Sequence, residues 1–219
     1  TQDEVSVLVF NPASPNANAG PNQQVCSSSA TLAGNAPLAP ATGTWTVVSG
    51  TGTFANADSP TTSVSNLSIG ANVFQWALSN GPCANGLTTS QVTITRFDPN
   101  TPAANAGPDQ DLCSVSGTGT ASTTMAASAA TAPATGSWSI VSGPPGAAIT
   151  TASSPTTTVT NLTVGTHTLR WTVNNGPCVP PASTDDVVIR VFDRNMASAD
   201  AGPDQNLCAP VASVTLAGI

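Results

Sequence analysis

Apolar and polar side chains alternate along short segments of this chain. In residues 74–79 large apolar side chains alternate with small or polar ones, and residues 168–173 show the same pattern. Because successive side chains of a β-strand point to opposite faces, this alternation predicts strands with one buried face. The residues expected to point inward are Phe74, Trp76, Leu78, Val92 and Ile94 in the first half of the chain, and Leu169, Trp171, Val173, Val187, Ile189 and Val191 in the second.

Segments rich in Val, Ile, Thr and Trp, bounded by Gly, Pro, Asn and Ser, recur throughout the chain. We expect strands near residues 24–33, 44–49, 52–56, 61–66, 71–80 and 88–97, and again near 111–115, 122–128, 137–142, 147–151, 156–161, 166–174 and 184–192. The Ala-rich stretch 125–134 is the only competing helical segment, and Pro133 argues against a helix there. Short strands separated by turns predict an all-β fold of immunoglobulin-like β-sandwich modules.

A repeat organises these strands into modules. Residues 18–23, 105–110 and 200–205 share the pattern Asn/Asp-Ala-Gly-Pro-Asn/Asp-Gln, and a cysteine follows each of them. The further matches, in the same order along the chain, are 43–50 with 136–143, 59–62 with 154–157, 74–76 with 169–171 and 80–83 with 175–178. Self-similarity in a fixed order is the signature of a tandem array.

The repeat predicts two complete modules and parts of two more. Residues 2–10 resemble residues 184–192, the last predicted strand of the second complete module, so we expect the array to extend in both directions. The expected boundaries are 1–11 for the last strand of a preceding module, 12–102 for the first module, 103–197 for the second, and 198–219 for the first strands of a following, truncated module.

The five cysteines occupy two repeat positions. Cys26, Cys113 and Cys208 follow the first motif, and Cys83 and Cys178 end the Asn-Gly-Pro-Cys turns. Because one cysteine of each kind opens and closes a repeat, we expect the disulfides Cys26–Cys83 and Cys113–Cys178, with the partner of Cys208 outside this sequence. Each would close a loop of roughly 60 residues, worth about 4 kcal/mol in the chain-entropy model. Such disulfides indicate an oxidising compartment outside the cytoplasm.

Composition and charge argue against several functions. The formal net charge is -7, charged residues make up 7% of the chain, and the few basic residues are scattered arginines. Phosphate binding needs clustered basic side chains, so we expect no nucleic-acid partner. No apolar run approaches the ~20 residues of a membrane helix. His167, the only histidine, is expected on the outward face of a strand, and no Cys-x-x-Cys pattern or catalytic set recurs, so we expect no enzyme.

Four tryptophans recur at equivalent positions, namely Trp45, Trp76, Trp138 and Trp171. Exposed tryptophans would offer platforms for sugars, whereas buried ones would pack in the core against the disulfides. Because all four lie inside alternating strands, we favour the core. Residues 66–68 and 161–163 match the N-glycosylation pattern, but they precede Gly-containing turns, and we favour a turn role.

Asp109 and Asp204 are candidate calcium ligands at the module junctions. Calcium takes six to eight oxygen ligands, and carboxylates near a junction could supply some of them. The competing role is a turn, in which the Asp side chain accepts a hydrogen bond from the local backbone. Asn22 holds this position in the first module, which argues against a strict need for the carboxylate, and we favour the turn.

The order of motifs resembles PKD-like and immunoglobulin-like tandem repeats of giant secreted surface proteins (adhesins) of Bacteroidota. The carrying residues are Ala-Gly-Pro-Asp-Gln at 106–110 and 201–205, Gly-Thr-Trp at 43–45, and the Asn-Gly-Pro-Cys turns. The resemblance covers essentially the whole chain. It implies type IX secretion and an extracellular, cell-surface location.

We therefore expect a structural repeat segment of an extracellular adhesin or filament, acting as an elongated spacer. The linkers at 97–102 and 192–195 are short, and the first contains two prolines, which favours end-to-end stacking. The expected partners are neighbouring modules of the same chain, and self-association into fibres is a further candidate. The alternatives are a glycan- or protein-binding module, or an accessory spacer of a large secreted polysaccharide-degrading enzyme.

Overall fold

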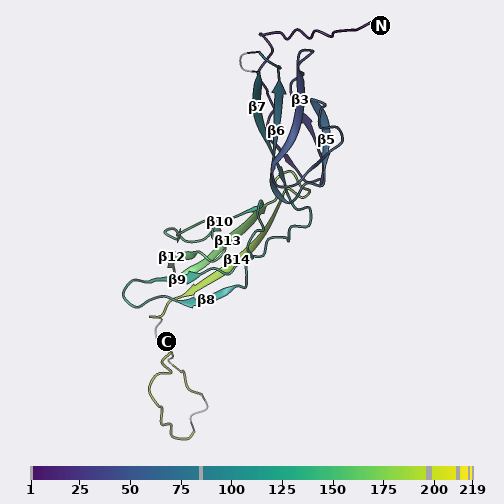
Figure 1. Cartoon of the computed structure of the whole chain (residues 1–219). Coiled ribbons are helices and arrows are strands. Elements are labelled where there is room, and N and C mark those ends of the chain that lie inside the picture. The colour runs from purple at the N-terminus through teal and green to yellow at the C-terminus, as the bar shows by residue number, and fades with distance from the viewer. Residues whose placement is uncertain (1, 84–85, 196–198, 211–212, 217, 219) are drawn as a thin grey trace.

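A computed structural model of the chain describes residues 2–83, 86–195, 199–210, 213–216 and 218. The secondary-structure elements in these residues are all β-strands, and none is a helix that could cross a membrane. The strands fall into two groups, placed one after the other along the chain (Figure 1). We call them module 1 (β1–β7) and module 2 (β8–β14).

Each module is a sandwich of a four-stranded and a three-stranded sheet, with the order β1-β7-β6-β3 and β2-β5-β4 in module 1 and β8-β14-β13-β10 and β9-β12-β11 in module 2. Module 1 contains β1 (Gln23–Val25), β2 (Ala30–Ala33), β3 (Thr42–Ser49), β4 (Thr53–Phe54), β5 (Thr61–Ser65), β6 (Gly70–Ser79) and β7 (Leu87–Arg96). Module 2 contains β8 (Gln110–Cys113), β9 (Thr120–Thr124), β10 (Thr135–Ser142), β11 (Ala148–Ile149), β12 (Thr158–Thr163), β13 (Gly165–Asn174) and β14 (Ala182–Phe192). The two topologies are the same, and the all-β sandwich predicted from the alternation is confirmed.

The strand order gives each module two distinct ends. β6 and β7 form an antiparallel hairpin whose turn follows Ser79. β1 pairs parallel to β7, and its last residue, Val25, lies opposite Arg96. The chain therefore leaves β1 and β7 at one end, which we call the distal end, and the hairpin turn lies at the opposite, proximal end. Module 2 has the same arrangement, with Cys113 at the end of β8 opposite Phe192 at the end of β14.

Each core is built around a pair of tryptophans on neighbouring strands. Trp45 of β3 lies opposite Trp76 of β6, with ring centroids 4.9 Å apart, and Trp138 and Trp171 repeat this pair at 5.2 Å. All four side chains are buried. The glycine of the Gly-x-Trp motif also has a packing reason, because a side chain on Gly43 would collide with the ring of Trp76.

The predicted strands agree closely with those of the structure, and the residues predicted to point inward on β6, β7, β13 and β14 are buried. The segment predicted at 24–33 is two strands, β1 and β2, joined by a bend. Residues 2–10, predicted as a strand, form none, and neither do the described residues of 198–219. A strand needs a sheet to pair with, and these segments have none here. Residues 1, 198, 211–212, 217 and 219 of the predicted flanking segments lie outside the described residues.

The prediction that His167 faces outward is wrong. His167 lies in β13, is fully buried, and points to the same side as Leu169 and Trp171. Its Nε2 lies 2.8 Å from the carbonyl oxygen of Thr163. Module 1 has Asn72 at this position, which is also buried. A polar side chain at this point of the core is therefore a feature of both modules.

Candidate functional site: the junction between the modules

A disulfide joins the two modules. Cys26 and Cys178 are bonded across 152 residues of sequence, with their Cα atoms 5.3 Å apart. The three other cysteines, Cys83, Cys113 and Cys208, are free thiols in the described chain. The predicted pairs Cys26–Cys83 and Cys113–Cys178 are therefore wrong. The covalent bond belongs to the junction and not to the interior of a module.

Strand order explains why a module cannot close its own disulfide. Cys26 follows β1 at the distal end of module 1, whereas Cys83 follows β6 at the proximal end. β6 has 10 residues, and at ~3.3 Å each it separates these ends by roughly 30 Å. A disulfide requires Cα atoms within about 7 Å of each other. The proximal end of module 2, which carries Cys178, is instead brought against the distal end of module 1.

Phe97 and Asp98 follow β7 directly and lie on the hairpin turn of module 2. The side chain of Phe97 is only 7% exposed, and its ring is so close to Gly176 that an added Cβ would lie 2.6 Å from it. The Asn175 side-chain amide donates to the carbonyl oxygen of Asp98 at 2.8 Å and accepts from the Thr101 hydroxyl at 3.2 Å. We call this arrangement of ring and hydrogen bonds on an Asn-Gly-Pro-Cys turn the seat. The seat and the disulfide together fix the junction.

The hairpin turn of module 1 carries a second seat. The ring of Phe10 lies against Gly81, where an added Cβ would be 2.6 Å from it. The Asn80 side-chain amide donates to the carbonyl oxygen of Asn11 at 2.8 Å. Cys83 lies at the same place in its turn as the bonded cysteine of module 2, with its Sγ 3.8 Å from the Phe10 carbonyl oxygen. The motif therefore builds the same contacts twice, once with the disulfide and once without it.

The distal end of module 2 presents the other half of such a junction. Cys113 is exposed and lies opposite Phe192 in the β8–β14 ladder. The side chain of Phe192 is 51% exposed, whereas Phe97 at the closed junction is 7% exposed. No hairpin turn covers this ring and thiol in the described part of the chain. The sequence contained the signal for all three sites, since each predicted last strand ends in Phe and is followed by Asn or Asp.

The tryptophans do not form an exposed platform for sugars. Each indole N–H donates to a backbone carbonyl oxygen inside its own module: Trp45 to Ser59, Trp76 to Asn35, Trp138 to Pro155 and Trp171 to Ser128. Their expected packing against an intramodular disulfide is wrong, because the disulfide lies at the junction and neither core cluster includes a cysteine. The tryptophans pack on each other instead.

Asp109 uses its carboxylate to hold two strands together. Its Oδ1 accepts from the backbone N–H of Val188 at 2.9 Å, and Asn22 accepts from Thr93 at 2.8 Å in module 1. An amide oxygen accepts this hydrogen bond as well as a carboxylate oxygen does, which explains why module 1 has Asn where module 2 has Asp. No group of three or more His, Cys, Asp or Glu side chains placed to hold a metal is found among the described residues. Calcium at Asp109 and Asp204 remains a prediction from sequence.

Both N-glycosylation patterns begin at a left-handed residue. Asn66 has φ 60° and Asn161 has φ 55°, and both residues are exposed. Asn adopts this conformation more readily than most residues. Asn66 directly follows β5, whereas Asn161 lies at the register shift of β12. The backbone therefore gives a reason for Asn at these positions that needs no glycan.

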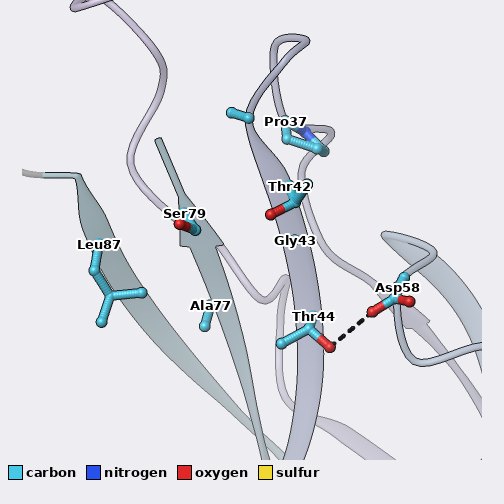
Figure 2. A pocket seen from close by; sticks show the side chains of 9 residues that line it. Pro37, Thr42, Gly43, Thr44, Asp58, Ala77, Ser79 and Leu87 are labelled. Carbon is cyan, nitrogen blue, oxygen red and sulfur yellow. Dashed lines mark hydrogen bonds between the residues drawn. The ribbon is translucent and has the colours of Figure 1, made fainter. Parts of the chain in front are cut away.

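A hollow lies on the surface of module 1 (Figure 2). It is lined by Pro37, Ala41, Thr42, Gly43, Thr44, Asp58, Ala77, Ser79 and Leu87. The Thr44 hydroxyl donates to Asp58 at 2.9 Å. The lining has no aromatic ring for stacking a sugar. Module 2 has Ser153 and Ala182 where module 1 has Asp58 and Leu87, so the chemistry of the hollow is not repeated.

One charged pair stands out on the surface of module 2. Arg170 and Asp186 face each other across β13 and β14 and form a bidentate pair, with distances of 2.7 and 2.8 Å. The hydrogen bond from Arg170 holds the pKa of Asp186 below its ordinary value of 3.8, and the same bond raises the pKa of Arg170. In module 1 the equivalent residues are Gln75 and Gln91, which form a neutral hydrogen bond at 3.4 Å.

Comparison with known proteins supports the fold and gives no family. No protein-family model and no curated protein matches the chain. Immunoglobulin domains 1–5 of Sidekick-1 match 82% of this chain with a TM-score of 0.50 and 13% identity, and the chain spans 39% of that structure. The PKD domain from the KIAA 1837 protein is 28% identical over 47% of this chain and 92% of its own, with a TM-score of 0.34. A SusE-like surface located polysaccharide binding protein from the Bacteroides thetaiotaomicron heparin utilisation locus matches 81% of this chain and 34% of its own, at 13% identity and TM-score 0.32. The chain has the fold of two tandem immunoglobulin-like β-sandwich modules.

Proposed function

We propose that this chain is a spacer segment of an extracellular cell-surface adhesin or filament. The observation that carries the proposal is the junction, where a disulfide and the Phe97 seat hold two sandwiches end to end. A short linker alone leaves neighbouring modules free to reorient. A second covalent connection removes much of that freedom, which is the property required of a segment that sets a distance.

The extracellular location rests on the same bond. Disulfides persist in oxidising compartments and are rare where glutathione keeps thiols reduced. The low content of charged residues and the absence of lysine leave few sites for proteases that cut after basic residues, which suits a surface-exposed stalk. Type IX secretion and an origin in Bacteroidota belong to the proposal on the strength of the sequence resemblance.

The spacer role is tested by the solution shape of the chain. We expect small-angle X-ray scattering to give one extended shape for the oxidised chain, and a broader distribution of dimensions for the variant Cys26→Ser/Cys178→Ser. Cys113→Ser is the matched control, because this thiol is exposed and unbonded here. Equal distributions for the two forms would contradict a disulfide-fixed spacer. Antibodies against the chain should label intact cells that produce it, and labelling only after permeabilisation would contradict a surface location.

A binding role is the second candidate, and the hollow on module 1 favours it because its chemistry is confined to one module. The same segment could also serve as an accessory spacer of a large secreted polysaccharide-degrading enzyme. A glycan array probed with the oxidised chain separates binding from spacing. Binding that Asp58→Ala abolishes would support the binding module, and no bound glycan leaves the spacer.

A further inference from the structure

We propose that Cys83 and Cys113 are halves of two further inter-module disulfides, each made with a module of this kind placed next to it along the chain. Cys83 would bond the cysteine that ends the first strand of a module before module 1. Cys113 would bond the turn cysteine of a module after module 2. The inference concerns this chemistry alone and stands whether or not the chain is a spacer.

The first observation is the bonded pair itself. Cys26 is at the distal end of one module and Cys178 is in the proximal turn of the next. Cys113 is the distal cysteine of module 2, in the same place relative to its last strand, and Cys83 is the turn cysteine of module 1. Each unbonded thiol therefore has a bonded counterpart in the neighbouring module.

The second observation is the seat on module 1. Phe10 and Asn11 contact Gly81 and Asn80 in the way that their counterparts contact the turn of module 2. These two residues lie in the segment that leads into module 1, so the seat holds that segment beside the turn. At the closed junction the distal cysteine lies next to the equivalent strand end, since Val25 accepts a hydrogen bond from the Phe97 N–H at 2.8 Å. An adjoining module would thus deliver its distal cysteine to the Cys83 thiol.

The third observation is the exposed ring at the other end. Phe192 is 51% exposed where its counterpart, Phe97, is 7% exposed under the turn of module 2. Covering an aromatic ring of this kind stabilises the covered state, because its apolar surface is removed from water. The occupant that fits is an Asn-Gly-Pro-Cys turn, because its glycine lies against the ring at both seats that the structure describes, where an added Cβ would collide with the ring. That turn would bring its cysteine to Cys113.

Bond formation requires an oxidant, and a small-molecule disulfide such as oxidised glutathione supplies it. The Cys113 thiolate attacks one sulfur of the oxidant and expels the other half as a thiolate, which leaves a mixed disulfide on Cys113. The thiolate of the turn cysteine then attacks the Sγ of Cys113 and expels the second half. The two cysteines lose two protons and two electrons, and the oxidant's disulfide is reduced to two thiols.

A three-module protein tests the proposal. Residues 105–219 are attached after residue 199, so that a second copy of module 2 follows module 2 through its own linker. After oxidation with glutathione, monomers are isolated by size exclusion, denatured, and their free thiols are titrated. We expect Cys113→Ser in the first copy to expose one additional thiol, because the turn cysteine of the appended module loses its partner.

Cys113→Ser in the appended copy is the matched control, and it should remove one thiol, because that cysteine has no module after it. If the first-copy variant also loses one thiol, Cys113 was unbonded and the proposal is wrong. A disulfide-linked dimer that Cys113→Ser abolishes would also overturn it, since the partner would be another molecule. A circular dichroism spectrum typical of β-sheet and a cooperative unfolding transition in both variants show that a change in thiol count does not come from misfolding. The mirror protein, residues 1–98 followed by 12–219, applies the same count to Cys83.

Discussion

Module 1 and module 2 share their topology, their tryptophan pair and their seat, yet they differ in the polar residues that occupy equivalent positions. Module 1 has Asn72 in its core where module 2 has His167. A neutral pair of glutamines links β6 and β7, whereas Arg170 and Asp186 link β13 and β14. The fold therefore depends on apolar positions and on turn geometry, and it accepts different polar solutions between them. The comparison also separates what holds a module together from what joins two modules.

The largest effect should come from the tryptophan pair. Trp76→Ala and Trp171→Ala each remove a fully buried indole and its hydrogen bond to the backbone. We expect each variant to lower the free energy of unfolding of its own module by about 3–5 kcal/mol. Calorimetry or urea unfolding would measure this, with Val48→Ala as an exposed control. A large difference between the two variants would show that the cores are not equivalent.

The next effect should distinguish the seat on module 2, which a disulfide accompanies, from the seat on module 1, which has no disulfide. Gly176→Ala and Gly81→Ala place a side chain on a left-handed residue and against a phenylalanine ring. We expect Gly176→Ala to cost about 2–4 kcal/mol, because the disulfide prevents the turn from moving away. Gly81→Ala should cost less, since no disulfide from Cys83 holds the turn against Phe10. Thermal unfolding measures both.

Gly119→Ala is the matched control for backbone strain, because its φ of 67° is close to the 59° of Gly81 and nothing lies near its added Cβ. Its cost should equal the part of the Gly81→Ala effect that does not involve a ring. Equal losses of stability in Gly176→Ala and Gly81→Ala would contradict the idea that the disulfide holds the turn of module 2 against Phe97.

Exchanging the buried polar residues Asn72 and His167 between the modules should destabilise module 1 more than module 2. The Asn72 side chain accepts from Thr51 and Ser68 and donates to the carbonyl oxygens of Ser68, Gly70 and Ile94. An imidazole cannot replace all of these bonds, so Asn72→His should destabilise module 1 by about 1–3 kcal/mol.

The reverse change, His167→Asn, should cost module 2 less. His167 makes one hydrogen bond through Nε2, and its Nδ1 has no partner among the described residues. Urea unfolding of the two exchanges, measured side by side, gives the difference. A larger loss in module 2 would contradict this account of the two sites.

The smallest effect should be a dependence of the stability of module 2 on pH, caused by the Arg170–Asp186 pair. Module 1 has neutral glutamines at these positions and should lack this contribution. The hydrogen bond from Arg170 lowers the pKa of Asp186, so the ionised pair stabilises the folded state above the ordinary carboxyl pKa of 3.8. This contribution is lost as the pH falls through the lowered folded-state pKa. The pair is exposed, so the effect is small. NMR titration of the Asp186 carboxyl checks the direction, and Arg170→Gln should return its pKa toward the ordinary value.

The alternation of side chains was sufficient to predict the strands, the burial of the four tryptophans and the β-sandwich fold. This prediction succeeds because one face of each sheet is buried, so apolar and polar residues alternate along each strand. His167 was misplaced because its polarity outweighed its position, although it continues the inward series of Leu169 and Trp171. The same alternation, followed strictly, would have placed it in the core.

The disulfide pairing could not be read from the order of the cysteines. Order along the chain does not reveal that β1 runs parallel to β7, and this parallel pairing puts Cys26 at the distal end. The two cysteines of a module are then about one strand length apart. The seat was also missed, because its aromatic residue was assigned to the end of a strand. Its repeated neighbours, Phe-Asp/Asn and Asn-Gly-Pro-Cys, were the signal available in the sequence.

The position of the Cys26–Cys178 bond decides how the chain carries a mechanical load. A force pulling on the two termini reaches Cys26 from one side and Cys178 from the other, and the disulfide transmits it directly between them. Residues 27–177, which form most strands of both modules, lie outside the loaded path. Fully extended, this stretch, which spans the sequence separation of 152 between the two cysteines, would add roughly 500 Å to the chain. That length is released only by reduction of one bond, so the junction acts as a stop that limits extension.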